Sequence, residues 1–173
     1  SNENKIAKQN KDLDKRFIFF NSGFNLRSTD IAASIGLSQF KDLDKFIESR
    51  NNLRKKIIIE IKKNKKLKNV IQIIEQNTNV EASWFGIPIL LSKKINKKNF
   101  LANLESSGVE TRPIISGNFL KQPAIKKYKL HYKTTMKNAD YINDHGFFIG
   151  LPNNNYTLLK IKKLVKIFEK SIR

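Results

Sequence analysis

The feature that most constrains the fold is a long run of apolar residues spaced three and four positions apart, from about Ser38 to Lys63. Charged residues fill the positions between them, which is the pattern of an amphipathic helix. Such a helix has one long apolar face, and a second layer of the protein must cover it. The apolar positions are Phe40, Leu43, Phe46, Ile47, Leu53, Ile57 and Ile61.

Short apolar segments elsewhere in the chain can supply that second layer. Their length and composition favour β-strands, and we expect strands at residues 17–20, 70–74, 83–91, 109–115 and 146–150. Further helices are expected at residues 97–107, 138–144 and 157–172. Gly108 follows the first of these, as glycine commonly follows a helix C-terminus. The predicted fold class is therefore α+β, a small sheet with helices packed on one face.

A glycine-led segment without lysine precedes the long helix. Gly23 permits a turn, and Ser28 or Thr29 offers a capping oxygen to a short helix with Asp30 in its first turn. We expect Gly36 to interrupt that helix. Residues 1–16 are polar and without periodicity, which indicates an arm or a truncated end, and residues 17–173 are expected to form the domain.

The charge of the chain raises the question of a nucleic-acid partner. The 34 Lys and Arg residues exceed the 15 Asp and Glu residues, giving a formal net charge of +19, and clustered cations bind phosphates. Most of the cations are lysine, however, whereas base and bidentate phosphate recognition favours arginine. The lysine-rich runs fall between apolar segments, where a solvated surface is the simpler interpretation. A freestanding basic domain that binds RNA, DNA or anionic lipid stays open as an alternative.

The composition excludes several other classes of protein. The chain has no cysteine, which excludes disulfides and thiolate metal sites, and its 2 histidines make a histidine-rich metal site improbable. The longest apolar run, "WFGIPILL", is far shorter than the ~20 residues that cross a bilayer. No segment has the pattern of a secretory signal. We expect a soluble cytoplasmic protein with no membrane partner.

Catalytic sequence motifs are missing from the chain. It contains neither a phosphate-binding glycine loop nor a nucleophile elbow. Its carboxylates are scattered along amphipathic helices, where exposed ion pairs are the simpler role. Residue types alone therefore indicate an interaction or accessory domain.

The order of longer motifs adds a resemblance to a known family. The motifs are "GFNLRSTDIAASIGLSQF", "SWFGIPILL", "LANLESSGVETRPI", "GNFLKQPAIKKY" and "NADYINDHGFFIGLP". In this order they resemble the C-terminal part of the DegT/StrS family of PLP-dependent sugar aminotransferases, over about residues 17–173. The resemblance implies the small C-terminal domain of a fold-type-I PLP-dependent transferase. The family's large domain, which carries the Schiff-base residue, is expected upstream of this chain, so no catalytic residue is expected within it.

The resemblance also implies an activity. Members of the family commonly transfer an amino group from glutamate to a nucleotide-linked 4-keto-6-deoxysugar for lipopolysaccharide synthesis. They use pyridoxal 5'-phosphate as cofactor and are homodimers. The element formed by Gly117, Asn118, Gln122 and Pro123 is more similar to the nucleotide-sugar 3-dehydratase branch, which removes the C3 hydroxyl and has His in place of the Schiff-base Lys. Aminotransferase comes first as the commoner activity, and 3-dehydratase is the alternative. A dimerisation module is a third possibility.

Four residues are candidates for ligand contacts by this resemblance. Asn25 is expected to reach the PLP phosphate bound by the partner subunit, or else to be a turn residue. Arg27 is expected at phosphate or the substrate diphosphate, or in an ion pair. Arg112 suits a diphosphate or sugar hydroxyls, or a structural place at a strand end. Asn118 is expected to bond the sugar, or to form a turn.

The remaining notable side chains are expected to be structural. His131 and His145 are assigned to the surface or to packing, and Trp84, Phe147 and Phe148 to the core. Because a large domain would cover part of its apolar surface, the isolated chain is expected to self-associate.

Overall fold

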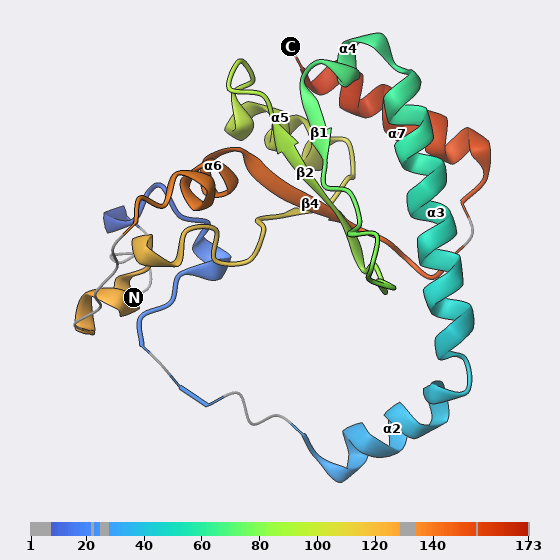
Figure 1. Ribbon diagram of the computed structural model, residues 1–173, viewed down its shortest axis with the longest axis horizontal. Coiled ribbons are helices and arrows are strands. Elements are labelled where there is room, and N and C mark those ends of the chain that lie inside the picture. The colour runs from blue at the N-terminus through green and yellow to red at the C-terminus, as the bar shows by residue number, and fades with distance from the viewer. Residues whose placement is uncertain (1–7, 22, 25–27, 129–133, 155, 173) are drawn as a thin grey trace.

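The protein is described by a computed structural model, which covers residues 8–21, 23–24, 28–128, 134–154 and 156–172. Within these ranges an antiparallel sheet forms the centre, with strand order β1-β2-β4-β3 (Figure 1). In the central pair Ile89 lies opposite Phe147. The strands are β1 (Ile71–Ile73), β2 (Gly86–Leu91), β3 (Thr111–Arg112) and β4 (Gly146–Gly150).

Helices cover one face of this sheet, which confirms the predicted class. Three of the helices supply most of the side chains that enter the core against that face. These helices are α3 (Leu43–Lys63), α5 (Lys97–Ser106) and α7 (Leu158–Ser171). The short α4 (Lys65–Lys68) follows α3 and adds Leu67 to the core. Helix α6 (Lys137–His145) leads into β4 at one end of the sheet (Figure 1).

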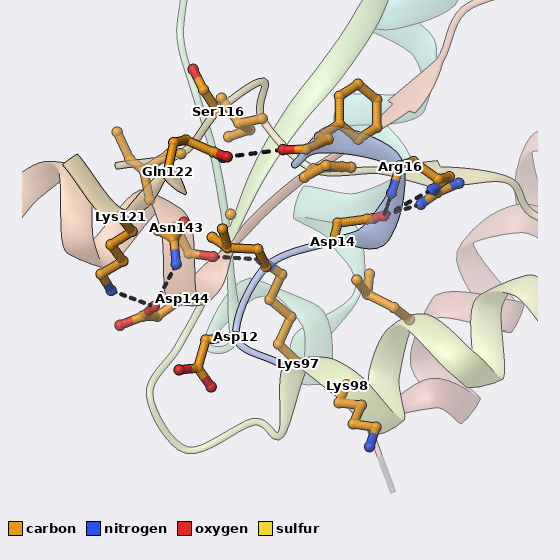
Figure 2. A pocket seen from close by; sticks show the side chains of 18 of the residues that line it. Asp12, Asp14, Arg16, Lys97, Lys98, Ser116, Lys121, Gln122, Asn143 and Asp144 are labelled. Atoms are coloured by element: carbon orange, nitrogen blue, oxygen red, sulfur yellow. Dashed lines mark hydrogen bonds and ion pairs between the residues drawn. The ribbon is translucent and has the colours of Figure 1, made fainter. Parts of the chain in front are cut away.

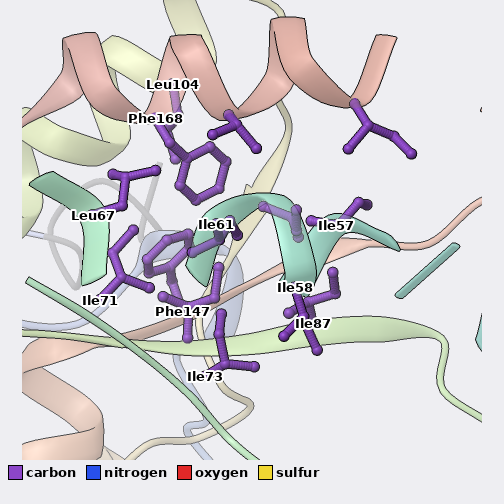
Figure 3. Packing of buried hydrophobic residues seen from close by; sticks show 14 of the residues in the cluster. Ile57, Ile58, Ile61, Leu67, Ile71, Ile73, Ile87, Leu104, Phe147 and Phe168 are labelled. Carbon is purple, nitrogen blue, oxygen red and sulfur yellow. The ribbon is translucent and has the colours of Figure 1, made fainter. Parts of the chain in front are cut away.

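The core follows from strand alternation. On β2 the side chains of Ile87, Ile89 and Leu91 are fully buried in the core cluster beneath the helices, because alternate residues of a strand point to one face. Phe147 meets Phe168 from α7, with ring centroids 6.5 Å apart (Figure 3). It also meets Phe100 from α5, with ring centroids 5.8 Å apart.

Two other aromatic side chains predicted for the core differ in detail. Phe148 is buried but lies outside that core cluster. Its ring packs edge-on against the ring of Phe85, with centroids 5.5 Å apart. Trp84 is partly buried against the core, and the guanidinium of Arg54 stacks 4.1 Å from the centroid of its ring.

Helix α2 (Asp30–Phe40) is exposed along its whole length and lies away from the sheet (Figure 1). Thr29 caps it, because its hydroxyl accepts from the Ala32 amide at 3.2 Å. Gly36 does not interrupt it, contrary to expectation; one glycine costs a helix only about 1 kcal/mol. Four large apolar side chains of α2 are exposed: Ile31, Ile35, Leu37 and Phe40.

The expected strand at residues 17–20 is wrong. The 3₁₀ helix η1 (Lys15–Phe17) occupies its beginning, and residues 18–20 are irregular. An apolar run alone does not make a strand, since a strand needs a neighbouring backbone to pair with. Here the side chain of Gln122 and the backbone amide of Ala124 take that place.

Two other boundaries also differ from expectation. The expected strand at residues 109–115 contracts to β3, because Pro113 directly follows it and has no amide proton to donate. The long helix expected from Ser38 begins only at Leu43, since the chain turns after α2.

Candidate functional site

A cleft of about 710 Å³ lies where the N-terminal residues, the start of α5, the loop after β3 and the end of α6 meet (Figure 2). The loop carries two further 3₁₀ helices, η2 (Phe119–Lys121) and η3 (Pro123–Lys127). The lining mixes charges of both signs: Lys11, Asp12, Asp14, Arg16, Lys97, Lys98, Lys121 and Asp144. Such a lining suits a polar, charged ligand better than an apolar one.

Lys97 is the half-buried cation of this cleft. It is the first residue of α5, which Asn96 caps by accepting from the Asn99 amide at 3.0 Å. Its Nζ donates to the carbonyl oxygen of Asn143 at 2.8 Å (Figure 2). Burial lowers the pKa of Lys97, and the charges of Asp144 and Asp14 partly oppose that effect. An ammonium has three protons, so Lys97 can also donate to an anionic group.

Arg16 and Asp14 form a forked ion pair at another wall of the cleft. Nε and Nη2 of Arg16 donate to the two carboxylate oxygens at 3.1 and 2.8 Å. The hydrogen bond from Arg16 holds the pKa of Asp14 below its ordinary value. Nη2 also donates to the Thr111 carbonyl oxygen at 3.2 Å, which ties these residues to β3. The predicted domain boundary at residue 16 stays a prediction.

Asn118 has a structural place in the loop. It is buried, and its Nδ2 donates to Asp140 at 2.8 Å. Its Oδ1 accepts from the Leu120 amide at 3.0 Å and so caps η2. Gly117 before it has φ +50, and a side chain there would collide with Asn143. These bonds fit the turn interpretation, and the expected contact of Asn118 with a sugar stays a prediction.

Gln122 is a residue whose role the sequence reasoning missed. Only 2% of it is exposed. Its Oε1 accepts from the Phe19 amide at 2.9 Å, and its Nε2 donates to the Phe17 carbonyl oxygen at 3.1 Å. The Ala124 amide then donates to the Phe19 carbonyl oxygen at 2.8 Å. The Gln-Pro dipeptide served only as a family marker, and no local signal pointed to partners about a hundred residues away.

Arg112, a further candidate, does not line this cleft. Arg112 is exposed, opposite Phe148 in the register, and donates through Nε and Nη2 to one oxygen of Glu110 at 3.0 and 2.9 Å. Its proposed substrate contact stays a prediction. Asn25 and Arg27 lie outside the described residues.

His145 does not line the cleft. The ring of His145 lies against Tyr141 with centroids 4.6 Å apart, in keeping with a packing role. His131 lies outside the described residues. Among the residues that the structure covers, no group of acidic or histidine side chains is placed to hold a metal ion.

Comparison with known proteins places the chain in a family. Residues 4–161 match the model of the DegT/DnrJ/EryC1/StrS aminotransferase family. The chain belongs to this family. The resemblance read from the ordered motifs is thereby confirmed, and the family match extends into the N-terminal residues that the motifs left out.

Relatives within the DegT/DnrJ/EryC1/StrS family include two proteins named GDP-4-keto-6-deoxy-D-mannose 3-dehydratase. The one from Yersinia pseudotuberculosis is 34% identical over 165 residues, which cover 91% of this chain and 39% of the relative. The one from Escherichia coli O55:H7 is 31% identical over 153 residues, covering 86% of this chain and 38% of the relative.

A solved structure agrees with these relatives. It is GDP-4-keto-6-deoxymannose-3-dehydratase with a trapped PLP-glutamate geminal diamine, with a TM-score of 0.71, 27% identity, and coverage of 90% of this chain and 39% of that one. The 173-residue chain thus spans about two fifths of the length of the proteins it matches. None of the helices in the described ranges is long and apolar enough to cross a membrane.

Proposed function

We propose that this chain is the C-terminal portion of a PLP-dependent 3-dehydratase that acts on a nucleotide-linked 4-keto-6-deoxysugar in lipopolysaccharide synthesis. The observation that carries the proposal is the match of 91% of the chain to a relative of that name at 34% identity. Sequence reasoning put the aminotransferase first, because it is the commoner activity. The 3-dehydratase now comes first, since these relatives and the element from Gly117 to Pro123 both favour it. Amino transfer remains the second candidate.

The cofactor of the whole protein would supply an electron sink for bond breaking at the sugar when bound. The contribution of this chain is the turn that begins at Gly23. A side chain at Gly23 would meet nothing within 4 Å, and Phe24 is 94% exposed. The described flanks of the turn are therefore open to a group brought by another chain. Asn25 would hold the cofactor phosphate there, as a neutral donor.

The cleft described above would bind the anionic part of the substrate. Lys97 and Arg16 lie on its walls and can donate to phosphate oxygens. Partial burial of Lys97 strengthens such a contact, because charges interact more strongly away from water. The carboxylates of Asp12 and Asp144 can accept hydrogen bonds from sugar hydroxyls.

The whole protein is proposed to be a homodimer. Helix α2 is apolar around its circumference yet exposed, a pattern typical of a helix that is buried in a larger assembly. It follows directly after the turn assigned to the partner's cofactor. Packing of α2 at the subunit interface would hold that turn against the neighbouring subunit.

The test is an assay of the complete gene product that contains this chain, with GDP-4-keto-6-deoxymannose, glutamate and PLP. A product that has lost the C3 oxygen supports the 3-dehydratase. A product that has gained an amino group at C4 would overturn it in favour of amino transfer. The Asn25→Ala variant should bind PLP at least tenfold more weakly, which equilibrium dialysis measures without turnover. Asn52→Ala, at an exposed position of α3, is the control.

A further inference from the structure

Lysines gather on the side of the helical layer that faces away from the sheet. Helices α3, α4 and α7 lie against one another there, and Lys66 of α4 pairs with Glu169 of α7 at 2.7 Å. We define the basic helical face by its exposed lysines. They are Lys55, Lys56, Lys62, Lys63, Lys65, Lys66, Lys68, Lys162, Lys163, Lys166 and Lys170.

Few acids balance these cations. Lys62 pairs with Glu75 at 2.8 Å and Lys63 with Glu60 at 2.7 Å, in addition to the Lys66 pair. For the other lysines of this face, no ion pair is formed with any residue that the structure describes. The face therefore carries a strong net positive charge, which attracts a polyanionic surface.

Aliphatic side chains stand among these lysines. Ile59 is 50% exposed, and lysines lie three and four residues on either side of it. Leu159 is 78% exposed and shares one ridge of α7 with Lys163, Lys166 and Lys170 by its spacing. An aliphatic group ringed by lysines matches the boundary between lipid headgroups and acyl chains.

Nucleic acid is a poorer fit to the same face. Its cations are all lysine, which lacks the planar fork of arginine for phosphate and base edges. Stacking of single-stranded bases needs exposed aromatic rings. The described aromatic side chains with large exposure are Phe19, Phe20, Phe24, Phe40, Phe85, Phe119 and Tyr128, and none belongs to α3, α4 or α7.

A second protein layer is also a poor fit. Lysine is depleted in protein interfaces, because its flexible and strongly hydrated ammonium is costly to bury. The additional length that the relatives have is thus better accommodated at the exposed helix α2 than here. The basic helical face is left to solvent and to anionic partners.

We infer that the basic helical face attaches the protein to an anionic lipid bilayer, with its lysines at the lipid phosphates and Ile59 and Leu159 entering the headgroup layer. This attachment is peripheral and is independent of the proposed function, because it uses none of the cleft residues. It departs from the expectation of no membrane partner, and the vesicle experiment below decides between the two. The sequence places these lysines in two separate runs, and the fold brings those of α4 and α7 together.

The test is co-sedimentation of the 173-residue chain with vesicles of phosphatidylglycerol and phosphatidylcholine, at about 0.1 M salt. Binding should rise with the phosphatidylglycerol fraction and fall with salt. The quadruple variant K162Q/K163Q/K166Q/K170Q should bind at least tenfold more weakly. The matched control K8Q/K41Q/K94Q/K127Q removes the same charge from exposed lysines outside this face and should retain most of the binding.

Leu159→Asn separates lipid from other polyanions, because it leaves every charge in place. It should weaken vesicle binding severalfold and leave binding to a 30-nucleotide RNA unchanged. Circular dichroism checks that each variant is folded. Equal losses in the two quadruple variants would overturn the inference in favour of unspecific charge attraction. Tight RNA binding with no effect of Leu159→Asn on vesicles would overturn it in favour of nucleic acid.

Discussion

The amide of Gln122 bonds both the Phe19 N–H and the Phe17 carbonyl oxygen, two groups that a neighbouring strand would otherwise pair. Replacing it with an apolar side chain would leave both groups without this partner in a partly buried place. Gln122 thus supplies two of the bonds that hold residues 17–19 against the domain, beside the bond from the Ala124 amide to the Phe19 carbonyl oxygen. The segment precedes Gly23 by only a few residues, so the variant of Gln122 also tests how the proposed turn is anchored.

The variant Gln122→Leu tests this attachment. We expect the free energy of unfolding to fall by about 2 kcal/mol, because each unsatisfied group costs about 1–3 kcal/mol and water partly replaces the lost bonds. Urea denaturation measures the loss, and hydrogen exchange should show faster exchange of the Phe19 amide. Gln72→Leu, in an exposed position of β1, is the control and should leave that amide unchanged. Unaltered protection of Phe19 in Gln122→Leu would contradict the role.

The Asp14–Arg16 pair predicts a dependence of stability on pH. The pKa of Asp14 is lowered in the folded protein, so the unfolded chain binds more protons in acid. The pair therefore stabilises the protein above the ordinary carboxylate range, and this contribution is lost as the pH falls through the lowered pKa. At pH 7 Asp14→Asn should destabilise by less than about 1 kcal/mol, because the pair is largely exposed.

Urea midpoints at pH 7 and at about pH 2 measure this difference. The gap between the wild type and Asp14→Asn should shrink in acid, and Arg16→Gln should show the same trend because it removes the same pair. A gap of equal size at both pH values would contradict a contribution from the charge of Asp14.

At the scale of elements, the core is held by aromatic contact between two helices and the sheet. Phe168 of α7 meets Phe100 of α5 with ring centroids 5.9 Å apart and edge-on planes, and both meet Phe147 of β4. All of them are fully buried. Truncating one ring leaves a cavity that the others cannot fill without moving a whole helix.

Phe168→Ala should therefore lower the free energy of unfolding by about 3–5 kcal/mol. Phe85→Ala removes the same atoms from a side chain that is 62% exposed, and it should cost less than about 1 kcal/mol. Thermal and urea unfolding of both variants measure the contrast. Similar losses in the two would mean that the interior of the domain lies elsewhere.

Elements with a strong periodic pattern were predictable from the sequence, and contacts over long distances were not. The apolar spacing and Gly108 correctly predicted α5, and the continuous apolar run predicted β2. The segment at residues 17–20 has the composition of a strand, yet its pairing partner is a side chain more than a hundred residues away. The same limit hid the bonds of Asn118 and Gln122, since both depend on tertiary neighbours.

For the whole molecule, the exposed apolar surface of α2 dominates the expected behaviour in solution. Ile31 is 75% and Leu37 is 77% exposed, and an apolar surface of this kind is covered in stable proteins. The isolated chain should therefore associate with itself as its concentration rises, in spite of its +19 charge.

Family membership was predictable at this scale from the order of the motifs, because several motifs in the right order are specific even where each single motif is weak.

The double variant I31E/L37E should abolish this association and give a monomer by light scattering, because it puts charge into the surface that would be buried. The control S34E/Q39E adds the same charges to α2 but keeps its large apolar side chains, and it should still associate. A clean monomer of the unmodified chain at high concentration would refute the prediction.

The hydrogen bonds from Gln122 to residues 17–19 also matter for how this region can evolve. Two paired strands share many backbone bonds and tolerate almost any substitution on their exposed sides, so no one codon can separate them. Here the two bonds to Phe17 and Phe19 come from one side chain. A single nucleotide change at that codon can loosen the segment while the sheet and its helices stay folded. Selection can thus adjust the reach of the Gly23 turn independently of the domain that carries it.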